Sequence, residues 1–154
     1  MERDLKVRSS TVSSDDRAGT ASIDETGIRK LVYGFYDSVR GDPLIGPVFE
    51  REIEADQWPV HLAKMCDFWS SVLLRTRRYS GRPMAPHLRM EGLSDAHFER
   101  WLTLFQATAH RVFDEEGAAV VMAFAERIAQ NFRLSRALHR GEDTTRMKPL
   151  RVGV

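Results

Sequence analysis

Residues 24–40, DETGIRKLVYGFYDSVR, decide the fold class because their apolar side chains follow a helical period. The apolar positions, at i, i+3, i+4, i+7 and i+11, are Ile28, Leu31, Val32, Phe35 and Val39. This spacing puts them all on one side of a helix, so we expect a helix whose apolar face is buried. The sequence Gly41-Asp42-Pro43 should end it, because proline disfavours a helical conformation in the residue before it. A compact turn, PLIGPVFE, follows.

Three further stretches have the same period. Residues 57–75 should form a helix with Asp56 as its N-cap. Its common face carries His61, Met65, Phe68, Trp69 and Val72. Two long helices follow, and Gly117 should separate them. The first should have Ser94 as its N-cap and apolar residues up to Phe113, and the second carries apolar residues from Val121 to Leu138. Because their link is short, they should pack antiparallel. No segment alternates in the manner of a strand, so the sequence predicts an all-α fold.

Size and composition favour one globular domain in the cytoplasm. The 154 residues suit a single domain, and 23 Lys and Arg against 22 Asp and Glu give a net charge of +1. This balance argues against a nucleic-acid or anionic-membrane partner. Apolar runs are far shorter than the ~20 residues that cross a bilayer, and the N-terminus lacks the apolar core of an export signal. The single cysteine, Cys66, excludes an internal disulfide and favours a cytoplasmic setting.

The terminal segments differ from the middle of the chain. Residues 1–22 are polar, rich in Ser and Thr and without a sustained apolar period, so we expect a flexible leader. Residues 139–154 form a polar, mildly basic run that glycine and proline interrupt, and we expect a flexible tail. The folded domain should therefore span residues 23–138.

Histidines are the first candidates for chemistry, and two of the five stand out. His61 lies on the apolar face of the second predicted helix, and His87 lies in the irregular segment PMAPHLRM among hydrophobic neighbours. A lone histidine is more often a hydrogen-bonded core or surface residue than a ligand. Zinc has little support, because the sequence has no His-Glu-x-x-His pair and no cysteine cluster. Cys66 is better explained as a small buried hydrophobe than as a nucleophile.

Aromatic residues point more clearly to a pocket. Those that could line one cavity between the first three predicted helices are Tyr36, Phe49, Phe68, Trp69, Tyr79, Trp101 and Phe105. By itself, a helical aromatic row is more often simple core. Haem, however, requires such surroundings: a flat apolar slot, a neutral imidazole to hold iron, and a few polar groups at the open iron position.

Four strings resemble the group III truncated haemoglobins: FYDSVRGDPLIGPVF, WPVHLAKMCDFWSSVLL, RYSGRPMAPH and HFERWLTLF. The resemblance runs from about residue 23 to residue 138, and the Gly-Gly signals of other truncated-globin groups are absent from the sequence. It implies a two-over-two helical sandwich around one haem b (iron protoporphyrin IX).

The resemblance also implies roles for single residues. His87 matches the proximal iron ligand. Tyr36 and Trp101 match distal residues, and His61 matches the distal histidine at the pocket entrance. The residues that match other pocket positions are Met65 over the iron, Phe49 as the haem wedge, Phe68, Trp69, Tyr79 and Phe105 in the wall, and Arg78 as a propionate partner.

The implied activity is binding of a diatomic ligand, O2, CO or NO. Three uses stay open: oxygen storage or transport, ligand sensing without turnover, and redox turnover such as NO dioxygenation or a peroxidase-like reaction at Tyr36, His61 and Trp101. Turnover would need a separate reductase, because the sequence has no flavin- or nicotinamide-binding motif. A helical interaction module without haem is a separate and weaker interpretation. The sequence does not indicate an oligomeric state.

Overall fold

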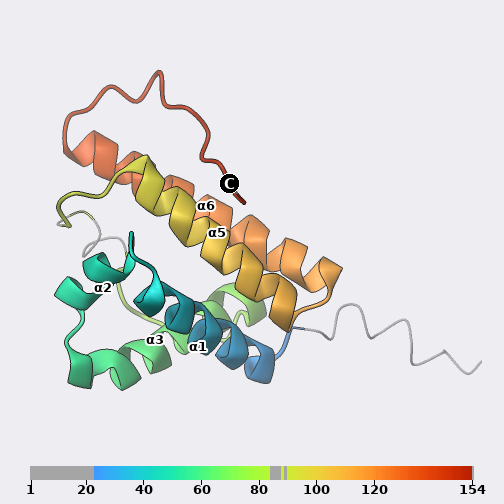
Figure 1. Ribbon diagram of the computed structural model, residues 1–154. Coiled ribbons are helices and arrows are strands. Elements are labelled where there is room, and N and C mark those ends of the chain that lie inside the picture. The colour runs from blue at the N-terminus through green and yellow to red at the C-terminus, as the bar shows by residue number, and fades with distance from the viewer. Residues whose placement is uncertain (1–22, 84–87, 89, 154) are drawn as a thin grey trace, which may run out of the picture.

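A computed structural model describes residues 23–83, 88 and 90–153, and this part of the chain is helical without a strand (Figure 1). The elements are α1 (Glu25–Gly41), α2 (Gly46–Glu52), the 3-10 turn η2 (Ala55–Gln57), α3 (Trp58–Leu74), α5 (Asp95–Val112) and α6 (Glu115–His139). The all-α prediction is confirmed.

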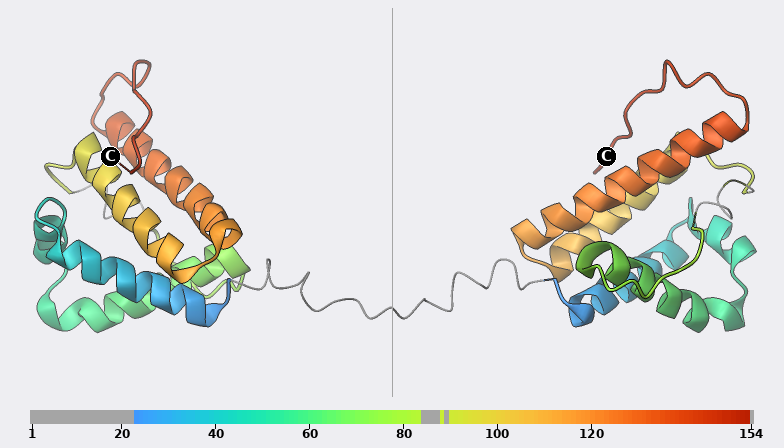
Figure 2. Two further views of the ribbon diagram at one scale, coloured as in Figure 1. Left: turned by 45° about the vertical axis from the view of Figure 1, so that its right-hand side comes forward. Right: turned by 180° about the vertical axis from the view of Figure 1, so that it is seen from behind.

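The helices form two layers. α5 and α6 run side by side in opposite directions and lie over α1 and α3, as two further views also show (Figure 2). α1 is central, because it packs against α3 on one side and α5 on the other. Its predicted apolar row is the middle of the core, where Ile28, Leu31, Val32, Phe35 and Val39 are each at most 2% exposed. The predicted two-over-two sandwich is therefore the observed architecture.

The turn after α1 contains a helix that the sequence analysis missed. The Asp42 carboxylate accepts hydrogen bonds from the backbone N–H groups of Leu44 (2.9 Å) and Ile45 (3.0 Å). These bonds reverse the chain, and α2 then begins with Pro47 in its first turn, a position that needs no N–H donor. The segment PLIGPVFE is thus a turn followed by a short helix.

One predicted helix start, that of α6, and one predicted N-cap, that of α3, were wrong. Asp114 caps α6 by accepting a 2.7 Å hydrogen bond from the N–H of Gly117, so Gly117 lies inside the helix instead of before it. α1 starts in the same way, since Asp24 accepts a 2.7 Å hydrogen bond from the N–H of Gly27. At α3, Gln57 instead of Asp56 occupies the N-cap, without a side-chain hydrogen bond.

Gly27 also allows a close approach between helices. A Cβ atom at this position would lie 2.6 Å from Cε1 of Phe113, which is too close for any real contact. The start of α1 can therefore pack directly on the end of α5 only because residue 27 has no side chain.

The end of the chain returns to the helices. The sequence predicts a flexible tail over residues 139–154, but His139 still belongs to α6, and Leu150 and Val152 pack against the core. The N–H of Gly153 donates a 3.1 Å hydrogen bond to the Thr103 hydroxyl of α5. The predicted leader, residues 1–22, lies outside the described residues, and no helix that the structure describes is long and apolar enough to cross a membrane.

Candidate functional site

A cavity of about 710 Å³ opens between α1, α2, α3, the segment after α3, α5 and α6. Its volume lies within the range of ~300–1,000 Å³ that is usual for ligand pockets. The predicted site residues that line it are Tyr36, Phe49, His61, Met65, Phe68, Trp69, Arg78, Tyr79 and Trp101. Predicted site residues from five separate parts of the chain thus meet at one cavity.

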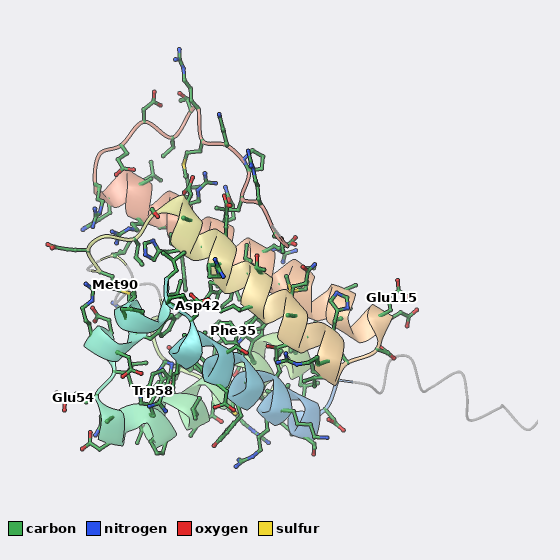
Figure 3. The ribbon with its side chains drawn as sticks, viewed as in Figure 1. Phe35, Asp42, Glu54, Trp58, Met90 and Glu115 are labelled. Carbon is green, nitrogen blue, oxygen red and sulfur yellow. The ribbon has the colours of Figure 1, made fainter. Side chains whose placement is uncertain are left out.

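Phe105 is the described site residue that does not line this cavity. It is fully buried one layer behind the wall, where its ring stacks on Trp69 (4.9 Å between centroids) and on Trp101 (5.1 Å). Phe35 meets Trp101 edge-on at 5.4 Å and projects from α1 towards α5 (Figure 3). Phe105 therefore supports two wall tryptophans from behind.

Tyr36 brings a polar group into an apolar wall. Its side chain is 7% exposed, and its ring meets those of Phe35 and Phe49 edge-on at 4.9 and 5.8 Å. Burial raises the pKa of the Tyr36 phenol well above its ordinary value, because the phenolate would lose its hydration. The phenol therefore stays protonated and is available as a hydrogen-bond donor.

His61 lies directly beside Tyr36. The two rings meet edge-on with 5.0 Å between centroids, and the Nε2 atom of His61 is buried. Met65 follows one turn later on α3 and lines the same cavity. Trp101, from α5, contributes an indole, which has one N–H donor and no acceptor. The cavity wall thus carries a phenol, an imidazole and an indole.

Arg78 and Tyr79 form part of the cavity rim, and a polar network holds the chain around them. Arg78 pairs with Glu25 (Nη1 to Oε1, 3.2 Å), and the buried Ser70 hydroxyl donates a 2.6 Å hydrogen bond to the same carboxylate oxygen. The N–H of Tyr79 donates to the Ser71 hydroxyl at 2.9 Å. The segment after α3 is therefore tied both to α3 and to the start of α1.

The Tyr79 ring closes one side of the cavity. It meets Phe68 edge-on at 5.3 Å, and partial burial raises the pKa of its phenol. A Cβ atom at residue 81 would lie 2.5 Å from the Tyr79 hydroxyl oxygen, so Gly81 leaves the space that this side chain occupies.

Comparison with known proteins decides the family. No family model matches the chain. It is 35% identical over 113 residues to the group 3 truncated hemoglobin Ctb of Campylobacter jejuni, over 72% of this chain and 89% of that protein. The crystal structure of a group III truncated hemoglobin from Campylobacter jejuni superimposes with a TM-score of 0.70 at 35% identity, over 73% of this chain and 91% of that one. The chain belongs to the group III truncated haemoglobins.

Membership of this family implies a haem cofactor and gaseous ligands, and the cavity of this truncated haemoglobin suits such a cofactor. Its walls are largely aromatic and aliphatic, as the body of a porphyrin requires. Its rim carries the cations Lys64, Arg78 and Arg82, which complement carboxylate side groups. Size, apolar walls and cationic rim thus agree with one another.

Several cavity residues of this truncated haemoglobin were missed in the sequence. Lys64 lies one turn after His61 on the same face of α3, so helical spacing could have found it. Ile128 and Phe132 belong to the apolar face of α6, which looked like ordinary core. His97 lines the cavity too, but its Nδ1 also accepts a 3.1 Å hydrogen bond from the Ser94 N–H in the cap of α5.

The predicted proximal ligand, His87, lies outside the described residues. Pro83 and Met90, which flank the undescribed part of this segment, both line the cavity. The Met90 carbonyl oxygen accepts hydrogen bonds from the guanidinium groups of Arg136 on α6 and, at 3.1 Å, of Arg140, the C-cap of that helix. Met90 is therefore held against the C-terminal end of α6.

Proposed function

We propose that this truncated haemoglobin holds haem b through His87 and binds O2, CO or NO beside Tyr36 and Trp101. The observation that carries the proposal is Tyr36: a phenol that stays protonated, 7% exposed, in the wall of a cavity that is otherwise mostly apolar. A buried phenol usually finds a polar partner. A diatomic ligand that is polarised by binding to the haem iron would be such a partner.

The haem iron, when bound, would supply the atom to which the gas binds. The chain would supply the polar contacts and exclude water. Tyr36 and Trp101 would donate hydrogen bonds to the ligand, and hydrogen bonds of this charge-assisted kind contribute about 1.5–3 kcal/mol each. His61, on the side of Tyr36, would be the third polar group near the ligand and stands at the position that the family resemblance gives to the entrance.

Arg78, Arg82 and Lys64 would pair with the haem propionates at the rim. Arg78 already pairs with Glu25, and both side chains are about half exposed (53% and 44%). A guanidinium has five N–H donors, so Arg78 has enough of them for Glu25 and for a propionate.

Redox turnover is the finer part of the proposal. Donors beside the ligand support either NO dioxygenation or a peroxidase-like reaction, with Tyr36, His61 and Trp101 as the participating residues. Either reaction would need a separate reductase in the cytoplasm. The rival is a globin that senses its ligand or binds a partner without turnover; neither proposal involves a nucleic acid or a membrane. Repeated NO consumption from the O2 complex, with a reductant present, would favour turnover.

The proposed role of His87 is tested by substitution. His87→Gly should lose haem, or hold it with an altered absorption spectrum that added imidazole restores. His139→Gly is the matched control, because His139 is exposed at the end of α6 and should leave the spectrum unchanged. An unaltered spectrum and haem affinity in His87→Gly would show that another residue holds the iron.

A further inference from the structure

Trp58, the first residue of α3 (labelled in Figure 3), contacts Tyr36 and His61 of the proposed ligand site, here called the distal site. Trp58 does not itself line the cavity. Its ring meets the Tyr36 ring at 5.8 Å and the His61 ring at 5.7 Å, edge-on in both cases. Trp58 is 3% exposed, and its Nε1 has no hydrogen-bond partner among the described residues. Because burial of an unpaired N–H is unfavourable, the favourable contribution of this indole to packing comes from the contacts of its ring.

Arg40 covers this indole from the side of α1. The Cζ atom of Arg40 lies 4.5 Å from the centre of the Trp58 ring, a cation–π contact. Its Nε donates a 3.4 Å hydrogen bond to Glu50 of α2, which directs the guanidinium towards that side. Arg40 of α1 thus contacts both Trp58 of α3 and Glu50 of α2.

Two neighbouring side-chain contacts connect α1 and α3. Arg40 lies one turn after Tyr36 on α1, and Trp58 lies one turn before His61 on α3. The inner contact, at the cavity, is that of Tyr36 with His61, and the outer contact is that of Arg40 with Trp58. The position of the first turn of α3 therefore sets where the His61 ring lies relative to Tyr36.

The start of α3 has no side-chain cap. Its N-cap, Gln57, makes no side-chain hydrogen bond. A side-chain cap is the usual means by which a helix start is held, and it is missing at this helix. The outer contact, Arg40 with Trp58, lies at this uncapped start of α3.

We propose that Arg40 and Trp58 are positioning residues of the distal site. They hold the start of α3 against α1, and this keeps the His61 imidazole packed against the Tyr36 ring. The inference rests on the proposed ligand site for its functional meaning, but the geometry of His61 can be measured without a ligand.

The test measures how fast diethyl pyrocarbonate modifies His61 in the full-length chain, by peptide mass spectrometry, before and after haem is added. Arg40→Met removes the charge but keeps a long side chain. It should speed modification of His61 about two- to fivefold, because this is the range that corresponds to the loss of a solvent-exposed cation–π contact. Arg40→Lys keeps a cation over the indole and should restore the parental rate.

Arg29→Met is the matched control. Arg29 lies over Tyr33 at 4.6 Å, also on α1, and neither residue lines the cavity. In the CO complex, the C–O stretching band should shift or split in Arg40→Met and stay parental in Arg29→Met. Equal modification rates in Arg40→Met and the parent, or an equal increase in Arg29→Met, would overturn the inference. Failure to take up haem would refute the proposed function, while the His61 rates measured before haem is added would still decide this one.

Discussion

Replacing Tyr36 by phenylalanine should speed O2 release about 10- to 150-fold. The substitution removes a single hydroxyl group, so the loss is that of one hydrogen bond to the ligand. A charge-assisted hydrogen bond contributes about 1.5–3 kcal/mol, and each 1.4 kcal/mol is about tenfold in a rate or equilibrium constant.

The structure predicts that packing will survive this change. Tyr36 is held by edge-on contacts of its ring with Phe35, Phe49, Trp58 and His61, and a phenylalanine ring keeps all four. The melting temperature should therefore stay close to that of the parent. A change in the O2 dissociation rate can then be assigned to the hydroxyl.

The assay is stopped-flow mixing of the O2 complex with excess CO and dithionite, which measures the O2 dissociation rate constant. Tyr33→Phe is the control, because it removes a phenol one turn earlier on α1, away from the cavity lining. Tyr33→Phe should release O2 at the parental rate. If Tyr36→Phe does so too, and its O2 complex autoxidises no faster, Tyr36 is not a donor to the ligand and the proposed ligand site is wrong.

Three further predictions follow from other contacts. Trp101→Phe keeps the stack on Phe105 but loses the indole N–H, so the O2 dissociation rate should rise about tenfold. If Trp101 and Tyr36 donate to the same ligand, the effects of Trp101→Phe and Tyr36→Phe should be non-additive in the double variant, which stopped-flow mixing would show. Gly27→Ala drives a Cβ into Phe113 and should lower the free energy of unfolding by about 1–3 kcal/mol in urea titrations, whereas Gly41→Ala, with open space around the added atom, should not lower it. The folded state raises the pKa of the Tyr36 phenol, so the unfolded state loses this proton at a lower pH. The free energy of unfolding should therefore fall as the pH rises above about 10, and it should fall less steeply in Tyr36→Phe. Urea titrations at several alkaline pH values measure this fall, and an equal fall in both proteins would show that Tyr36 ionises freely in the fold.

Sequence patterns predicted the features that depend on local spacing. The buried row of α1 follows from helical period alone, and so does the common face of His61 and Met65. The aromatic wall was also recognisable, since most of its residues lie on such faces. These features need only the geometry of a single helix.

Contacts between distant segments could not be predicted in this way. Ser70 meets Glu25 across 45 positions, and the N–H of Gly153 meets Thr103 across 50. Phe105 shares a helix face with Trp101, and spacing cannot tell which of the two faces the cavity and which lies behind it. The pairing of Arg40 with Trp58 likewise depends on how α1 and α3 cross, which no local pattern contains.

The most direct test of the proposed function is a titration of the purified chain with haem, followed by its absorption spectrum. One haem should bind per chain and produce a Soret band, and reduction under CO should shift that band to the position of a CO complex. A chain that stays folded, yet gives no such band with an equal amount of haem, would contradict a haem site in the cavity between α1, α3, α5 and α6.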